Sequence, residues 1–325
     1  MILRASPPII FSSALHDYPL GFISYAPEMF LDRPSLHLVS PSWSLLSKTD
    51  RITTEYKRIR AEAPKAHVVT LASDGTEVHE LSSAGIPAIA CNHTMLTNER
   101  VFRPRASGNR MLADAVYNAR FAPWKRHHLC RKIDSLALIY FHIGGVADIE
   151  HEVRNVLVQA RYLNHEAGGG RFKWLSGEEV AGYISRCRVG LALSETEGAM
   201  RACMEYLFCG VPVISTPAEG GRLRYLLEPF AKVVEPDEDA IRAAVNHFVK
   251  AQLNPLAIRK AVANIVAFER HEFAETLNAL QRKIFGRESS FVAIDALIGN
   301  ALTYRPAKGI AAELDAARAY GQSLP

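Results

Sequence analysis

Two glutamates eight residues apart characterise the segment SETEGAMRACMEYLFCGVPVISTPAEGG, residues 194–221. Glu197 and Gly198 stand at the start of an expected helix, Gly198–Cys209, which carries Glu205 two turns on. The start of a helix attracts phosphate, because its unpaired N–H groups and its macrodipole are positive there. A phosphate repels carboxylates, so we expect the two glutamates to accept hydrogen bonds from sugar hydroxyls. The pattern predicts a ligand with phosphate in the middle and hydroxyl-rich groups on both sides, as in a nucleoside diphosphate sugar.

The same helix also has an ordinary structural interpretation. Its apolar residues recur at i, i+3, i+4, i+7 and i+8, the spacing of a buried helix face: Met200, Cys203, Met204, Leu207 and Phe208. Gly210 and Pro212 are typical residues beyond the end of a helix. This interpretation accounts for most of the helix but gives Glu197 and Gly198 no role, so the residues alone leave both alternatives open.

An alternation of strands and helices must position these residues. The run VGLALS (Val189–Ser194) is continuously apolar, which is typical of a strand buried on both faces of a sheet. Glu197 and Gly198 follow the carboxyl end of this strand, where open α/β sheets bind ligands. Short apolar runs alternate with amphipathic stretches over most of the chain, which predicts βαβ units and parallel sheets.

The expected elements divide at a polar linker, Arg103–Asn109. The expected strands are Pro8–Phe11, Gly21–Tyr25, Leu36–Val39, Ala66–Ala72, Pro87–Asn92, Met111–Ala119, Leu136–Ile143, Arg171–Leu175, Val189–Ser194 and Val211–Ser215. The expected helices are Ile52–Pro64, Ser73–Ile86, one that begins in Arg126–Ser135, Ile149–Asn164, Ser176–Cys187 and Gly198–Cys209. From Asp237 onward the pattern is mostly helical.

Composition excludes several classes of protein. The chain has 325 residues, enough for two domains, and a net charge of +4. This charge suits an anionic small ligand but is too weak to indicate nucleic-acid binding. The five scattered cysteines argue against a disulfide framework or a zinc site and favour a reducing compartment. The N-terminus is a poor signal peptide and no apolar run could span a membrane, so we expect a cytoplasmic protein.

The densest basic cluster, RFAPWKRHHLCRK, spans residues 120–132. Arg120 and Lys125 suit a phosphate site, because arginine binds phosphate in a bidentate manner and lysine supplies a compact charge. A second interpretation is a basic patch that places the protein peripherally at the inner membrane surface. A third interpretation is a solvated helix face, which we expect to account for Arg126, Arg131 and Lys132.

The glutamate segment resembles the Glu–seven residues–Glu signature of family 4 retaining glycosyltransferases, which have the GT-B fold. The matches occur in the family's order: Ser194, Glu197, Gly198, Glu205, Cys209, Gly210, Pro212, Val213, Ile214, Gly220 and Gly221. Upstream, Arg120 and Lys125 match the pair that holds the donor diphosphate, and Tyr140–Gly145 is similar to the next strand and its glycine turn. The segment 172–194 resembles the one that holds the nucleotide base, and 98–104 resembles the interdomain segment.

The resemblance covers residues 86–221 and implies an α/β fold with two Rossmann-like domains facing across a cleft (GT-B), the N-terminal one shortened. We expect an acceptor-side domain at 1–105, a nucleotide-sugar-binding domain at 110–285 and a C-terminal helical segment at 286–325 that packs back on the first domain. The implied activity is a retaining, metal-independent transfer of a hexosyl or related sugar to an acceptor hydroxyl, in glycan or polysaccharide assembly. The acceptor is a glycan, a lipid-linked molecule or a small molecule. The nucleotide sugar is a substrate, so no cofactor and no nucleic-acid partner are expected.

The resemblance also assigns site residues. The implied catalytic residues are Glu197, Arg120 and Lys125. The implied donor-binding residues are Gly198, Ala199, Met200, Arg201, Glu205 and Gly144.

The sequence departs from the family pattern at several positions. The residues that replace the usual ones are Ala119, Ala199, Met200 and Arg201, of which we interpret the last as a surface side chain. The family's histidine near the sugar has no clear counterpart among His16, His37, His79 and His93. The departures keep two alternatives open, a nucleotide-sugar-binding subunit without turnover and a nucleotide-sugar epimerase.

Overall fold

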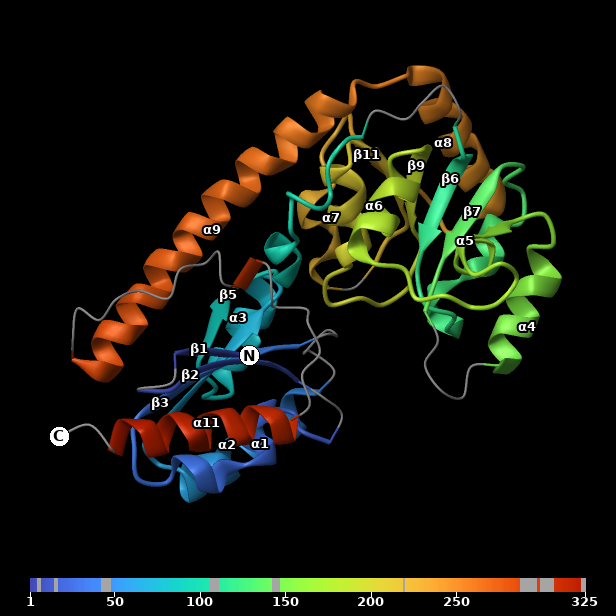
Figure 1. Cartoon of the computed structure of the whole chain (residues 1–325). Helices are drawn as coiled ribbons and strands as arrows, with labels where there is room; N and C mark the ends of the chain where they lie inside the picture. Colours follow the sequence, from blue (N-terminus) through green and yellow to red (C-terminus); the bar gives the residue numbers. More distant parts are fainter. Residues whose placement is uncertain are drawn as a thin grey trace. The chain divides into compact units, whose positions relative to one another are not determined.

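The computed structural model describes residues 1–4, 7–14, 17–41, 48–105, 111–141, 147–218, 220–286, 297–298 and 307–322. The chain divides into two compact units, one made of Met1–Leu96 with Ala267–Pro325 and the other of Thr97–Val266. Each unit is built on its own sheet, with helices packed against it (Figure 1).

The first unit contains a five-stranded sheet in the order β1-β2-β3-β4-β5. Its strands are β1 (Ile2–Arg4), β2 (Ile9–Ser13), β3 (Ser35–Ser40), β4 (Ala66–Ala72) and β5 (Ala88–Ala90). β1 is antiparallel to β2, and the other neighbouring strands run parallel. The helices are α1 (Phe22–Tyr25), α2 (Thr49–Glu62), α3 (Gly75–Ser83), α11 (Ala307–Gln322) and the last part of α9 (Pro255–Phe285), with the 3₁₀ turns η1 (Pro27–Phe30) and η3 (His93–Leu96).

The C-terminal helix α11 shares one hydrophobic core with the elements of the first ninety residues. Ile310 and Leu314 of α11 lie in the same buried cluster as Ile10 of β2 and Ile52 and Ile59 of α2. In Figure 1, α11 (red) lies beside α1 and α2 (blue). The helix α11 is therefore part of the core of the first unit.

The strand expected at Gly21–Tyr25 is wrong, because Phe22–Tyr25 forms the helix α1. Gly21 makes the turn into this helix with a φ of 64°. The Ser12 hydroxyl then accepts a hydrogen bond from the Phe22 N–H, at 3.1 Å. A buried apolar run of a few residues fits one helical turn as well as it fits a strand, so hydrophobic periodicity cannot separate the two.

The second unit contains a six-stranded sheet in the order β11-β10-β9-β6-β7-β8, in which all neighbours are parallel. Its strands are β6 (Ala113–Asn118), β7 (Leu136–Ile139), β8 (Arg161–Tyr162), β9 (Cys187–Ala192), β10 (Val213–Ser215) and β11 (Ala231–Val233). Its helices are α4 (Ala147–Val156), α5 (Leu163–Ala167), α6 (Gly177–Ile184), α7 (Arg201–Phe208), α8 (Glu238–Ala251) and the start of α9, with the 3₁₀ turns η4 (Pro123–Lys125), η5 (His127–Cys130) and η6 (Gly221–Tyr225). Residues 189–192 of β9 are all buried, as their apolar run predicts.

Four expected elements of the second unit differ in the structure. The helix expected at Ile149–Asn164 ends at Val156, and Arg161–Tyr162 forms the edge strand β8. The helix expected from Arg126 is replaced by the single 3₁₀ turn η5, because Arg126 itself adopts a left-handed conformation with a φ of 51°. Arg171–Leu175 forms no strand, and the edge of the sheet is instead the two-residue β8, which is too short to give an alternating pattern. The helix expected from Gly198 begins at Arg201, because Met200 is still extended.

All five cysteine side chains lie inside the protein and are unpaired with one another. Burial raises the pKa of the Cys203 thiol to about 12, so this group is neutral. None of the helices in the described part of the chain is long and apolar enough to cross a membrane.

Candidate functional site

Three neighbouring strands of the second unit end at the carboxyl edge of its sheet. β6 ends at Asn118, β9 at Ala192 and β10 at Ser215. The loops that leave these ends carry most of the charged residues singled out in the sequence. Ligands of open parallel sheets bind at this edge, so it is the candidate site.

An ion pair between Lys125 and Glu197 lies at this edge. The Lys125 Nζ donates to Glu197 Oε2, and the two side chains are only 9% and 15% exposed. The Tyr117 hydroxyl donates to the Lys125 carbonyl at 2.6 Å, and the Glu195 N–H donates to the Trp124 carbonyl at 2.9 Å. These bonds fasten the loop after β6 to the loop after β9. Removal of either partner would leave a largely desolvated charge unpaired.

Glu205 is buried inside the second unit rather than on the flank of its helix. Its Oε2 accepts a hydrogen bond from Asn118 Nδ2 at 2.8 Å, and its Oε1 lies 3.7 Å from Arg201 Nε. Burial raises the pKa of Glu205, while Arg201 and Asn118 act in the opposite direction. The Tyr206 hydroxyl accepts from the Asn118 N–H at 2.6 Å, so α7 is bonded directly to the end of β6.

The segment before α7 is packed inside the second unit. Gly198, Ala199 and Met200 are all buried, so the side chains of the last two are not open to a ligand. Arg201 is the first residue of α7 and its side chain is 42% exposed, in agreement with the surface interpretation. A cation at the positive end of a helix is unfavourable, which makes this position attractive to an anion.

The remaining predicted residues are placed as follows. Arg120 is half-buried, with its guanidinium carbon 4.7 Å from the centre of the Trp124 ring. Gly144 and His16 lie outside the described residues. Of the other histidine candidates, His37 is fully buried beside Ser35, with a pKa lowered to about 3 by burial, and His79 is exposed.

Two further arginines lie at the carboxyl edge: Arg222, which no sequence pattern singled out, and Arg126, which was expected to be solvated. Arg222 is 2% exposed and donates to the carbonyls of Ser194 (2.7 Å) and Thr216 (2.6 Å). Arg126 donates to the carbonyl of Leu193 and to the Thr216 hydroxyl, each at 2.7 Å. The prediction that Arg126 belongs to a solvated face is therefore wrong. No local pattern marks Arg222, because its acceptors are backbone carbonyls of two other loops.

The glycine pair of the sequence motif packs against the glutamate loop. The Gly221 N–H donates to the Gly198 carbonyl at 2.6 Å. Gly220 has a φ of 94°, and a Cβ atom there would lie 2.0 Å from the carbonyl oxygen of Glu197. Only glycine permits both this conformation and this approach.

Two exposed aromatic side chains stack close to the end of β7. Phe141 follows this strand by two residues, and its ring lies 6.0 Å from that of Trp174, with an interplanar angle of 28°. Trp174 is 64% exposed. A stacked, solvent-facing aromatic pair is suited to receive a flat ligand group. Neither ring was singled out from the sequence, because Phe141 follows a buried apolar run and Trp174 was assigned to a short strand.

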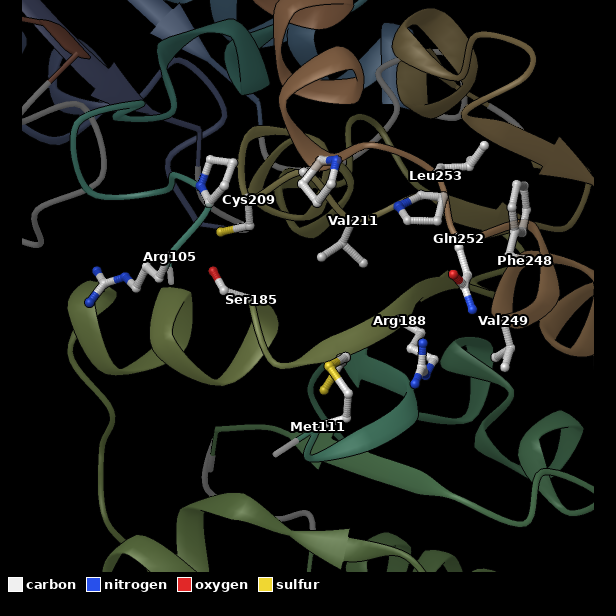
Figure 2. A pocket seen from close by; sticks show the side chains of 15 residues that line it. Arg105, Met111, Ser185, Arg188, Cys209, Val211, Phe248, Val249, Gln252 and Leu253 are labelled. Carbon is white, nitrogen blue, oxygen red and sulfur yellow. The ribbon is translucent and has the colours of Figure 1, made fainter. Parts of the chain in front are cut away.

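A cavity of about 370 Å³ lies at the opposite, amino edge of the same sheet (Figure 2). It is lined by Arg105 and Arg188 together with apolar side chains such as Met111 and Phe248. Arg105 pairs with Glu178, and Arg188 Nε lies 3.5 Å from an Asp114 carboxylate oxygen. Its arginines are already neutralised, and it holds none of the residues predicted to do chemistry.

Comparison with known proteins identifies the fold. No family model and no curated protein matches the chain. Among solved structures, the Anabaena HepE protein in complex with UDP superposes with a TM-score of 0.58 at 16% identity, covering 83% of this chain and 78% of that one. Sucrose-phosphate synthase from Thermosynechococcus elongatus gives 0.55 at 17% identity, covering 84% and 74%. Trehalose-6-phosphate synthase, studied for glycosyl transfer with retention, gives 0.53 at 11% identity, covering 80% and 70%.

At such identities the likeness establishes the fold alone. The two parallel sheets with their flanking helices agree with it, as the sequence resemblance predicts. The chain has the α/β fold of the GT-B glycosyltransferases.

Proposed function

We propose that the protein is a retaining glycosyltransferase that moves a sugar from a nucleoside diphosphate sugar to an acceptor hydroxyl. The observation that carries the proposal is the excess of positive charge at the carboxyl edge. Five cationic side chains gather there, Arg120, Lys125, Arg126, Arg201 and Arg222, with the three carboxylates Glu195, Glu197 and Glu205. A partly desolvated site with such an excess favours an anion of matching charge.

In this proposal Arg120 and Lys125 bind the diphosphate and stabilise it as it leaves. The start of α7 and Arg201 add positive potential, so the leaving group is stabilised by the chain's own groups without a metal ion. Glu197 accepts hydrogen bonds from the sugar hydroxyls. Glu205, oriented by Asn118, accepts from the ribose.

A uridine donor is the first candidate. The Anabaena HepE protein, similar in fold, was crystallised in complex with UDP and with UDP-glucose. Phe141 and Trp174 provide a stacking surface on the same sheet edge, which suits the face of a nucleotide base. The proposed reaction is the transfer of a hexosyl group. It takes place in the cytoplasm and serves glycan or polysaccharide assembly.

The basic cluster at 120–132 gives little support to contact with a membrane. Arg131 lies 3.5 Å from Glu238, and Lys132 donates to Asp239 at 2.5 Å. Arg126 turns into the protein. Apart from Arg120, which lies over the Trp124 ring, the arginines and lysines of this cluster are therefore paired with carboxylates or directed inward.

A second candidate function is nucleotide-sugar binding without turnover. It is favoured by Met200, which is buried before α7, and by the pairing of Lys125 with Glu197, which a diphosphate must displace. Nucleotide-sugar epimerisation is a third candidate. It would change the donor without a change in mass and without an acceptor.

The first experiment is calorimetric titration of UDP, GDP and ADP into wild type, Arg120→Ala and Lys125→Ala. We expect one nucleotide to bind wild type and to lose at least about tenfold in affinity in both variants, since each removes a charge-assisted contact. Arg188→Ala, at the amino edge, is the matched control and should bind as wild type does. Equal binding by all four proteins would show that Arg120 and Lys125 do not bind the phosphates.

Glu197→Gln separates binding from transfer. The neutral amide releases Lys125 and removes a negative charge beside the phosphate, so UDP should bind several-fold more tightly. Sugar release from UDP-glucose should fall by about 100-fold or more, because the acceptor for the sugar hydroxyls is lost. Mass and stereochemistry of the product distinguish transfer or hydrolysis from epimerisation, and tight binding with no product favours the binding subunit.

A further inference from the structure

Arg222 joins the ends of two parallel strands. It lies in η6 and its two terminal nitrogens bond the Ser194 carbonyl, beyond β9, and the Thr216 carbonyl, beyond β10. A buried guanidinium is retained only when hydrogen bonds replace its lost hydration. Desolvation lowers the pKa of Arg222 from its usual value, although it remains a cation. The bonds therefore serve to fix two loops that have no direct sheet pairing at this point.

Arg126 makes a second connection between the same two loops. Its Nε bonds the Leu193 carbonyl and its Nη2 bonds the hydroxyl of Thr216, which is fully buried. The backbone of Arg126 is left-handed, a conformation that favours glycine. Arg126 therefore adopts a backbone conformation that is unfavourable for a residue with a side chain. Its two side-chain hydrogen bonds offset this cost.

Both arginines act on the segment that leads into the proposed sugar-binding glutamate. Leu193 and Ser194 lie just before Glu197, and the glycines after Thr216 pack on the Glu197–Gly198 backbone. The two terminal nitrogens of Arg222 donate to carbonyls, and its Nε, which has no hydrogen-bond partner, is buried with the rest of the side chain, so a phosphate in the site cannot reach the guanidinium. We propose that Arg126 and Arg222, the arginine brace, are positioning residues that hold the Glu197 loop in register with Lys125. This inference rests on the proposed function.

The test compares Arg222→Lys and Arg126→Gly with wild type. Lysine keeps the charge but is too short to span both carbonyls as a planar fork does. Glycine suits the left-handed backbone, so Arg126→Gly removes the side chain without backbone strain. Arg224→Lys, exposed on the same turn, is the matched control. The readouts are kcat and KM for UDP release from UDP-glucose, UDP affinity, melting temperature and amide hydrogen exchange of residues 193–221.

For each brace variant we expect kcat to fall about 10- to 100-fold, since a displacement of about 1 Å costs that much at a reacting centre. UDP affinity should change by less than about threefold, and exchange should rise in residues 193–198. The double variant should lose no more than the worse single variant, because both arginines act through Thr216.

Other outcomes reject the inference in distinguishable ways. A parallel loss of UDP affinity and kcat would make the brace a phosphate site. A lower melting temperature with unchanged kcat, or additive losses in the double variant, would leave only a structural role. Wild-type protein that binds no nucleoside diphosphate would reject the proposed function itself, whereas binding with an unaffected Arg222→Lys kcat would reject the brace alone.

Discussion

The two edges of the second sheet use the same residue types in opposite ways. At the amino edge, Arg105 and Arg188 have side chains that are 31% and 37% exposed, each facing an exposed carboxylate. At the carboxyl edge, Lys125 and Arg222 are buried, and Arg222 is bonded to backbone carbonyls instead of a carboxylate. Exposed charges are screened by water and salt, whereas desolvated charges interact strongly. Under the proposed function, the desolvated cations of the carboxyl edge are the ones that interact with the charged ligand.

Helix dipoles sharpen this comparison. The amino edge cavity is lined by Ser185, Cys209 and Gln252, the residues that end α6, α7 and α8. Helix carboxyl ends are negative, so arginines there are neutralised locally. The carboxyl edge instead receives the positive start of α7, which adds to its cations. An anion is favoured at the carboxyl edge and not at the amino edge.

The largest effect is expected from Lys125→Met. It leaves Glu197 largely buried and unpaired, so we expect a loss of about 3 kcal/mol in the free energy of unfolding. Sugar release from UDP-glucose should fall by about 100-fold or more. Urea denaturation and a UDP-release assay measure the two effects. A variant as stable and active as wild type would contradict the contrast between the edges.

The next effect is expected from Gly220→Ala. A Cβ atom would meet the Glu197 carbonyl in a backbone conformation that disfavours alanine, so stability should fall by about 1–3 kcal/mol and kcat should fall with it. Gly182→Ala in α6 is the control, because nothing lies within 4 Å of its Cβ position. Gly182→Ala should raise the free energy of unfolding by about 0.5–1 kcal/mol. The melting temperatures of the two variants should therefore shift in opposite directions from that of wild type.

A smaller, pH-dependent effect is expected from His127. Burial and the neighbouring Lys125 lower its pKa from 6.5 to about 3, so the unfolded chain binds the proton more readily between these values. Its contribution to stability is complete above pH 6.5 and is lost as the pH falls, by at most about 1.4 kcal/mol per unit. Urea denaturation at pH 5 and pH 7 should show a smaller difference for His127→Phe than for wild type. An equal difference would place the acid sensitivity elsewhere, for instance at His37.

The smallest effect is expected from Arg188→Met. An exposed pair contributes less than about 1 kcal/mol, and salt weakens it further. Unfolding in low and high salt, together with UDP affinity, measures this change. Loss of UDP binding in this variant would show that the amino edge, not the carboxyl edge, carries the ligand.

Much of the fold follows from local sequence. Continuous apolar runs predict the buried strands, of which Val189–Ser194 corresponds closely to β9. The helix spacing predicts the buried face of α7. Short segments fail, because Gly21–Tyr25 and the two-residue β8 contain too few residues for a period to be recognised.

The candidate site, like the fold, could be predicted only in part. The sequence by itself determined that Lys125 and Glu197 follow strand ends and that Glu205 lies on the helix after Glu197, because these elements follow from local periodicity and glycine positions. Only the tertiary structure decided which of them meet and which are desolvated. Lys125 reaches Glu197 across 72 residues, and Arg126 reaches Thr216 across 90. The burial of a polar group depends on packing from distant segments, which no local pattern records, and for that reason Arg222 emerges only in the folded chain.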